Sequence, residues 1–346
     1  MTDYSLFSKP FLKTIIDETA ARQGLPATSV EKDWWVCLIL EALYSDPVLS
    51  ERLTFKGGTS LSKAYKLIHR FSEDIDIVID RRSLGFTGNR NPENAPSKSA
   101  RNRLMLALKS ASSAFIHDQL MPSLRSHLEA SKLVFQWSIN IDEHDQEGQT
   151  ILVSYESLFS SASYTHAYIQ PRVKIELGAR SGDEPIQIRA IRSMACEAFP
   201  EQSWSHDFQV RTLDPVRTFL EKICLIHEEN HRPLEKPIKD RMSRHLYDVC
   251  SLYNAGIGDK ALSDRDLFNR VLKHRTTYFF YSWMNYETMK PGSFMLVPPV
   301  DRLDFWRLDY EKLRSEMIYG QASNFPELLI TLNQIQNTLN SGSIFQ

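Results

Sequence analysis

The sequence lacks the segments that membrane and secreted proteins need. No part of its 346 residues forms an uninterrupted apolar run of about 18 residues, the minimum for a transmembrane helix. The N-terminal stretch carries Asp3, Lys9 and Lys13 and has no apolar core, so it does not have the pattern of a signal peptide. We therefore expect no membrane partner.

Cysteine and glycine are also scarce. The four cysteines, Cys37, Cys196, Cys224 and Cys250, are far apart and form no CxxC pair. This spacing excludes a disulfide framework or a zinc knuckle and favours the reducing environment of the cytoplasm. With only 13 glycines and many Leu, Ala, Glu, Lys and Arg residues, the composition favours helices.

Neither sign of charge dominates. The 41 Lys and Arg residues face 43 Asp and Glu residues, for a net charge of −2. The whole-chain charge therefore argues neither for nor against a nucleic-acid partner, and any binding surface must be a local patch. At roughly 150 residues per domain, the length predicts two domains.

Hydrophobic periodicity predicts an α+β protein in two parts. The expected strands are Leu53–Phe55, Ile75–Ile79, Leu133–Ile141, Ile151–Tyr155, Tyr168–Leu177 and Ile186–Ile191. The expected helices are Ser5–Gln23, Val30–Tyr44, Leu104–Leu128, Val216–Glu229, Pro237–Tyr253, Asp264–His274, Asp301–Glu316 and Pro326–Leu339, and a further helix begins near Ser60. The second helix has a capping signal at Thr28–Glu31, and Pro122 is expected to break the helix Leu104–Leu128. We expect a domain at residues 1–212, with N-terminal helices and a mixed sheet, and a helical domain at residues 213–346 that closes a cleft.

The strongest chemical signal is the segment Ser72–Asp80, in which Asp74 directly precedes the expected strand Ile75–Ile79 and Asp76 lies within it. Alternate residues of a strand share a face, so both carboxylates point the same way, while Ile75 and Ile77 face the core. Like-facing carboxylates repel each other, and a divalent cation such as Mg²⁺ is the natural compensation. The alternative is an exposed strand face with no metal.

A glycine turn precedes this strand. The residues Lys56-Gly57-Gly58-Thr59-Ser60 lie between a strand and a helix start, where glycine permits close approach of the backbone and the helix N-terminus attracts phosphate. Alone, the turn is explained as a tight connection. Together with the two carboxylates, it predicts a phosphate cradle beside a metal site, the layout of the polymerase-β-like nucleotidyltransferase fold.

Such a site needs a third carboxylate from a neighbouring strand. Glu176 is the candidate, because Val173, Ile175 and Leu177 alternate with Lys174 and Glu176. The alternative is an exposed Glu176 paired with Lys174.

These residues resemble a known family. The block Phe55–Lys63, followed by Arg70–Ile77, resembles the signature of the AbiEii/AbiGii toxins, nucleotidyltransferases of abortive-infection and type IV toxin–antitoxin systems. Val30–Trp35 resembles the family's N-terminal helix, and Asp301–Tyr310 resembles a C-terminal stretch of its longer members.

The resemblance implies roles for further residues. Lys222 corresponds to a family lysine that neutralises triphosphate charge, and Asp248 to an aspartate that orients it or a substrate hydroxyl. His245 departs from the aspartate common at its position, so no role is carried over to it. The exposed face of a helix is the alternative for both Lys222 and Asp248.

Two other patterns have competing explanations. Residues 227–231 read His-Glu-Glu-Asn-His, the HExxH pattern of zinc proteases, but Arg232-Pro233 ends the helix at once and no third ligand is evident, so we interpret the match as chance. Residues 81–110 hold seven cations and one acid, and they include the candidate RNA-binding residues Arg81, Arg82, Arg101 and Arg103. A solvated surface explains this segment equally well.

The sequence therefore predicts a cytoplasmic, Mg²⁺-dependent nucleotidyltransferase that transfers NMP from an NTP to a hydroxyl. Asp74, Asp76 and Glu176 would hold the metal, with two ions expected, and catalysis would also use Lys222 and Asp248. The predicted nucleotide-binding residues are Lys56, Gly57, Gly58, Thr59, Ser60 and Lys63. The resemblance implies RNA, such as a tRNA 3′ end, as the acceptor. It further implies growth arrest in phage defence and a cognate antitoxin encoded nearby.

Two alternatives remain open from the sequence. The acceptor could be a protein side chain, as in AMPylating enzymes, or the chain could be a non-catalytic nucleotide-binding protein. Labelling with α-³²P-NTP distinguishes an RNA from a protein acceptor, and absence of Mg·NTP binding would favour a non-catalytic binding protein with a relic site.

Overall fold

The computed structural model describes residues 4–160 and 170–341. The chain divides into two compact units. Unit 1 comprises Met1–Ala64 and Ser72–Thr212, and unit 2 comprises Tyr65–Phe71 and Leu213–Gln346. The chain therefore enters unit 2 twice, first between the glycine turn and the carboxylate strand. In the parts of the chain that the structure describes, no helix has the length and apolarity that a membrane span requires.

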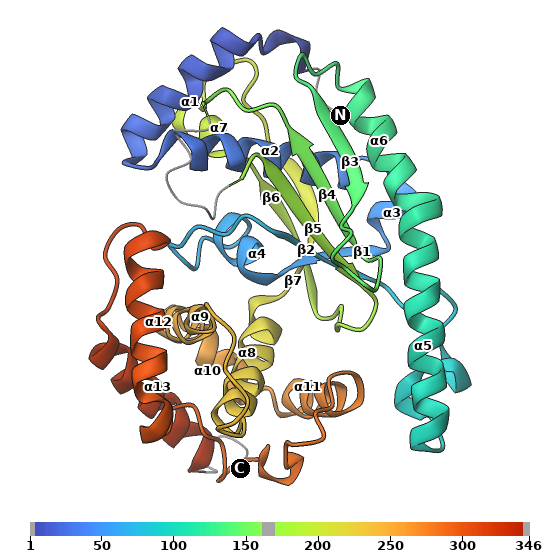
Figure 1. Cartoon of the computed structure of the whole chain (residues 1–346), viewed down its shortest axis with the longest axis vertical. Helices are drawn as coiled ribbons and strands as arrows, with labels where there is room; N and C mark the ends of the chain where they lie inside the picture. The colour runs from blue at the N-terminus through green and yellow to red at the C-terminus, as the bar shows by residue number, and fades with distance from the viewer. Residues whose placement is uncertain (1–3, 161–169, 342–346) are drawn as a thin grey trace. The chain divides into compact units, whose positions relative to one another are not determined.

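Unit 1 is built on a seven-stranded sheet (Figure 1). Its strands are β1 (Leu53–Lys56), β2 (Ile75–Ile79), β3 (Trp137–Ile141), β4 (Thr150–Tyr155), β5 (Arg172–Gly178), β6 (Ile186–Ile191) and β7 (Phe208–Leu213), in the order β3-β4-β5-β2-β1-β7-β6. Strand β2 is parallel to β5 and antiparallel to β1, so the sheet is mixed. The predicted mixed sheet with flanking helices is confirmed, and β2 has the predicted bounds.

The central helix of unit 1 is α2 (Ala27–Tyr44), which packs against α1 (Lys9–Gln23), α6 (Met121–Ala130), α7 (Met194–Ala198) and β5. It is buried from Thr28 to Leu43. On its sheet side, the ring of Trp35 stacks on Tyr155 of β4 with centroids 4.5 Å apart. Because this helix is inaccessible to solvent, its charged residues must find partners inside the protein.

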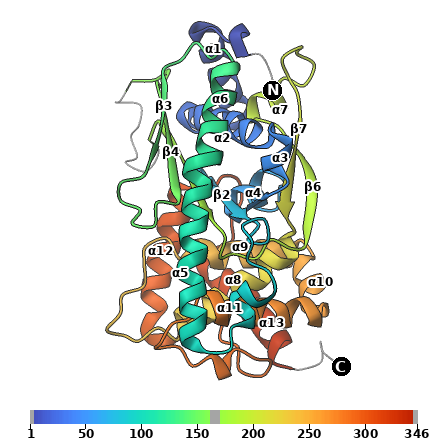
Figure 2. The same ribbon diagram turned by 90° about the vertical axis from the view of Figure 1, so that its right-hand side faces the viewer.

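Helices α5 (Lys98–Phe115) and α6 form one long rod in both views (Figures 1 and 2). A π-helical turn, Ile116–Leu120, joins them. Pro122 lies in the first turn of α6. Because proline has no N–H to donate, it fits after the wider π-helical turn. The helix is therefore not broken at Pro122 as predicted, and only its pitch changes locally.

Predicted helix starts are corrected at α2, α1 and α9, and also at α5, which begins at Lys98 rather than Leu104 and is capped by Ser97. Helix α2 begins at Ala27 after Pro26 and has no side-chain cap, because the carboxylate of Glu31 accepts instead from Ser157 Oγ and Leu158 N. Helix α1 begins at Lys9, where Ser8 caps it. Helix α9 begins at Ser243 rather than Pro237, because Asp309 accepts from the backbone N–H groups of Arg241 and Ser243 and holds the preceding residues in a loop.

Unit 2 is helical around α8 (Pro215–Asn230) and α9 (Ser243–Asn254). The surrounding helices are α10 (Ile257–Ser263), α11 (Arg265–Tyr278), α12 (Leu303–Glu316) and α13 (Phe325–Asn340). The segment Tyr65–Phe71 pairs with the residues that follow α12: Phe71 N donates to Met317 O at 2.7 Å, and Tyr319 N donates to His69 O at 2.9 Å. Backbone hydrogen bonds thus make this segment part of unit 2.

Candidate functional site

The glycine turn and the carboxylate strand are in direct contact in unit 1. Strand β1 ends at Lys56, which is aligned with Asp76 of β2, and helix α4 (Gly57–Lys63) begins at the next residue. Gly57 has φ +78°, and a Cβ placed on it would lie 1.9 Å from Asp76 Oδ2. Only glycine fits this position, because both the backbone conformation and the neighbouring carboxylate exclude a side chain.

The two aspartates of the strand lie in an electrostatically unfavourable environment. Ile75 and Ile77 are buried, whereas Asp74 and Asp76 are half-buried, as the alternation predicted. Burial, followed by the charges of Glu73, Glu176 and Asp76, raises the pKa of Asp74 to about 6. Carboxyl oxygens that destabilise one another's charge suit Mg²⁺, which takes one or two carboxylates together with phosphate oxygens and water.

Glu176 lies beside Asp76 in the parallel register of β2 and β5. Its carboxylate, however, faces Lys174, with Oε1 2.6 Å from Lys174 Nζ. Among residues 4–160 and 170–341, no three His, Cys, Asp or Glu side chains are arranged to hold a metal ion. Asp74 and Asp76 are therefore suited to bind a metal. Glu176 could become a third ligand only if its carboxylate broke the ion pair with Lys174.

The hydroxyl groups of the turn are used within the protein. Thr59 Oγ1 donates to the carbonyl oxygen of Asp74 and lies 2.9 Å from Ser72 Oγ, and Ser60 Oγ donates to the carbonyl of Gly57 at 2.9 Å. Both residues are fully buried. Their side chains thus hold α4 against the start of β2, and a phosphate at this turn would meet backbone N–H groups, which have no side-chain cap.

The two lysines of the turn also have partners in unit 1. Lys56 Nζ donates to Ser181 Oγ at 2.9 Å. Lys63 forms a buried ion pair with Asp33 of α2, with 2.5 Å between Nζ and Oδ1. The role of Lys63 in nucleotide binding stays a prediction, and the structure adds this internal partner.

Sequence reasoning missed the part that α2 plays here. Lys32 Nζ lies 2.7 Å from Glu73 Oε2, and both side chains are buried. Together with the Asp33–Lys63 pair, this contact ties α2 to the end of α4 and to the residue before Asp74. The available signal was a run of consecutive charges, followed by two tryptophans, on an apolar helix, because buried charges are almost always paired.

Unit 2 contains a second group of the predicted residues. Lys222 of α8 and Asp248 of α9 form a buried ion pair, with Nζ 2.9 Å from Oδ2. Asp248 also accepts two hydrogen bonds from Arg70, at 2.7 and 2.8 Å. His245 Nδ1 lies 3.2 Å from Lys222 Nζ. Neither Arg70 nor His245 was predicted to belong to this cluster.

Of the four candidate RNA-binding arginines, two are engaged within unit 1. Arg81 is buried and donates to the carbonyls of residues 180 and 181, and Arg82 pairs with Asp80, Asp183 and Glu184. Arg101 is half-buried and Arg103 exposed on α5, and neither has an ion pair within the described residues. All four stay predicted RNA-binding residues, and Arg101 and Arg103 would reach a phosphate backbone without breaking an ion pair.

The HExxH residues all have structural partners in unit 2. His227 is fully buried, its Nδ1 accepts from Met295 N at 2.9 Å and its Nε2 lies 3.1 Å from Thr288 Oγ1. Burial lowers its pKa to about 3, so the ring is neutral. The two glutamates pair with Arg275 and Arg232. The motif therefore serves packing within unit 2.

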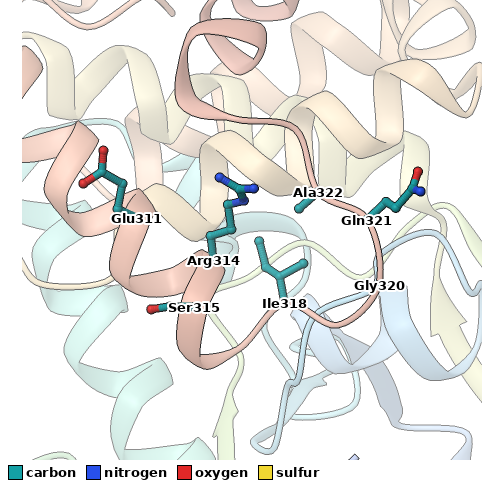
Figure 3. Close-up of a pocket in the computed structure, with 7 residues that line it drawn as sticks. All are labelled: Glu311, Arg314, Ser315, Ile318, Gly320, Gln321 and Ala322. Carbon is teal, nitrogen blue, oxygen red and sulfur yellow. The ribbon is translucent and has the colours of Figure 1, made fainter. Parts of the chain in front are cut away.

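A cavity of about 750 Å³ lies between α12 and the loop that follows it (Figure 3). It is lined by Glu311, Arg314, Ser315, Ile318, Gly320, Gln321 and Ala322. None of the residues predicted from the sequence to bind nucleotide, metal or RNA lines it. It is therefore a separate surface feature of unit 2.

Comparison with known proteins identifies the chain's relatives. Residues 38–331 match the family model described as nucleotidyl transferase AbiEii toxin, type IV TA system. No curated protein matches the chain. Among solved structures, it is similar to MenT4, a nucleotidyltransferase toxin from Mycobacterium tuberculosis H37Rv, with 13% sequence identity and a TM-score of 0.47 over 94% of this chain and 89% of that one.

Proposed function

The chain belongs to the AbiEii family of nucleotidyltransferase toxins from type IV toxin–antitoxin systems, and from that premise we propose that it transfers NMP from a Mg²⁺-bound NTP to a hydroxyl of RNA. The observation that carries the proposal is the contact between Gly57 and the carboxylate of Asp76. It joins a turn with uncapped backbone N–H groups to a pair of carboxylates, which are the two parts that a metal-bound triphosphate needs.

We assign the metal to Asp74 and Asp76, and the triphosphate to the backbone N–H groups at the start of α4. Bound Mg²⁺ would neutralise charge on the α-phosphate and on the leaving pyrophosphate. The acceptor oxygen forms a bond to the α-phosphorus as the bond to pyrophosphate breaks. Glu176, once separated from Lys174, takes the hydroxyl proton.

In unit 2, we assign Lys222 the binding of an anionic phosphate oxygen and Asp248 the orientation of that lysine. One contact and the burial of its two partners support this assignment: fully buried Asp248 holds the lysine at 2.9 Å, while Lys222 itself retains slight exposure. An ammonium group has three N–H donors and keeps one or more for a ligand when a fixed acceptor holds it.

The proposed acceptor is RNA, with a tRNA 3′ end as the specific candidate. Helix α5 supports this choice because it carries Lys98, Arg101, Arg103 and Lys109 and no acidic residue. A phosphate backbone is attracted by such an excess of cations. We further propose that the modified RNA causes growth arrest and that an antitoxin encoded nearby relieves it. The protein would act in the cytoplasm, in phage defence.

The test incubates purified protein with Mg²⁺, total RNA, total protein and each of the four α-³²P-NTPs in turn. We expect label in RNA with at least one NTP. Asp76→Asn should abolish labelling, whereas Asp80→Asn, which changes a carboxylate at the end of the same strand, should preserve it. Label confined to protein would establish a protein acceptor, and no label with any NTP would contradict catalysis.

A further inference from the structure

Asp248 lies at the centre of a buried cluster in which two cations share its carboxylate. It pairs with Arg70 and with Lys222, and its own side chain is fully buried. At Lys222, burial and the positive charges of Arg70 and Arg244 act against the attraction of Asp248 and lower the pKa of the ammonium. An anionic ligand would offset this effect, and Lys222 is the more exposed of the two cations that pair with Asp248.

His245 faces the ammonium of Lys222. The ring nitrogen Nδ1 lies 3.2 Å from Nζ. Because an ammonium can only donate hydrogen bonds, Nδ1 must accept, and the ring proton is on Nε2. The imidazole is therefore neutral in this arrangement.

The surroundings of His245 favour the same state. Burial is the main cause that lowers its pKa well below the usual value, and the positive charges of Lys222, Arg244 and Arg70 add to it. The carboxylate of Asp248 acts in the opposite direction. These charges come from α8, from α9 and from the segment Tyr65–Phe71, so each of these three elements contributes to the field at the ring.

We propose that His245 is a positioning residue that directs the ammonium of Lys222 toward an anionic phosphate oxygen. Asp248 and His245 each accept one of its N–H groups, and tetrahedral geometry then fixes the direction of the third. A neutral imidazole orients the lysine and leaves its positive charge available to the ligand, whereas a carboxylate at this position would offset that charge. The claim that this phosphate belongs to a nucleotide rests on the proposed function, but the claim that His245 positions Lys222 does not.

Three substitutions separate orientation from charge. His245→Asn keeps an acceptor near the place of Nδ1, His245→Leu removes the acceptor, and His245→Asp adds a negative charge. His69→Asn is the control, because His69 is an exposed histidine of the same unit whose ring lies against the Tyr319 ring. Thermal unfolding of each variant confirms that it is folded before it is compared.

The first measurement is the apparent pKa of Lys222, obtained from the pH dependence of its acylation and quantified by mass spectrometry. His245→Asp should raise this pKa by about 1–3 units, as expected for an added carboxylate at this distance. His245→Leu should lower it, and His245→Asn and His69→Asn should leave it near the parent value. An unchanged pKa in both His245→Asp and His245→Leu would overturn the proposal, whatever the enzyme's activity.

The second measurement is the affinity for inorganic triphosphate without metal, by calorimetry. We expect His245→Asp and His245→Leu to weaken binding by on the order of tenfold, the equivalent of one charge-assisted hydrogen bond, with His245→Asn close to the parent. Equal affinity in all variants would overturn the phosphate role of Lys222. If triphosphate binds as expected and RNA is not labelled, the proposed function fails while the assignment of His245 stands.

Discussion

The carboxylate of Asp76 occupies the space that a side chain at Gly57 would need, since a Cβ there would lie 1.9 Å from Oδ2. We expect Gly57→Ala to displace Asp76 and to abolish nucleotidyl transfer. Gly24→Ala is a matched control, because Gly24 has a similar φ of +66° and open space around it.

Both substitutions should cost about 1–2 kcal/mol of unfolding free energy from backbone strain alone. Only Gly57→Ala should also remove activity, as measured by label transfer from α-³²P-NTP. Full activity in Gly57→Ala would show that the position of Asp76 is not critical.

Asp74 should make the metal-free protein less stable as the pH rises. Its pKa is raised from 3.8 to about 6, so the folded state binds the proton more tightly than the unfolded state. The stabilisation that protonation provides is present below about pH 4 and is lost as the pH rises through about 6, with a loss of roughly 2–3 kcal/mol. Asp74→Asn should remove this dependence, which denaturant titrations at pH 4.5 and 7.5 would measure.

Added Mg²⁺ should restore the lost stability at pH 7.5 in the parent protein and in Asp80→Asn. It should have little effect on Asp74→Asn or Asp76→Asn, because each lacks one of the paired carboxylates. Equal stabilisation of all four proteins by Mg²⁺ would place the metal elsewhere.

Parts of the site formed by residues close together in the sequence could be predicted, and parts formed by distant residues could not. The carboxylate strand and the glycine turn are local patterns, and periodicity alone placed Ile75–Ile79 correctly. Lys32–Glu73 and Arg70–Asp248 are ion pairs between residues far apart in the chain. No local pattern indicates such partners, so both pairs emerged only from the fold.

The errors in secondary structure have a similar origin. Strand β7 alternates Phe208, Val210 and Thr212, but its short length and mixed polarity gave no clear signal until its pairing with β1 was known. The capping pattern at Thr28–Glu31 was overridden because Glu31 caps a distant loop. Tertiary contacts thus determined the secondary structure where local sequence preferences were weak.

Lys63 should act through stability rather than through nucleotide binding. Lys63→Met leaves the carboxylate of Asp33 buried without its cation, which should cost about 3–5 kcal/mol of unfolding free energy. Lys13→Met, which breaks an exposed pair on α1, should cost at most about 0.5 kcal/mol. Chemical denaturation measures both. A stable Lys63→Met protein with weakened Mg·NTP binding would instead support the nucleotide-binding role.

The acceptor is tested through the two α5 arginines that have no ion pair in the described structure. They lie two positions apart, so their directions diverge by about 200° around the helix, and at least one should contact an RNA that follows α5. Arg101→Glu/Arg103→Glu should weaken RNA binding and flatten its dependence on salt, because each lost phosphate contact lowers the slope of log K against log salt by about 0.7–0.9. Mg·NTP affinity should stay close to the parent value, since it depends on Gly57 and the aspartates.

The charge-matched control is Arg307→Glu/Lys312→Glu on α12, which should preserve the slope. An unchanged slope in the α5 variant, with label transfer intact, would identify α5 as a solvated surface and make a protein acceptor the better hypothesis.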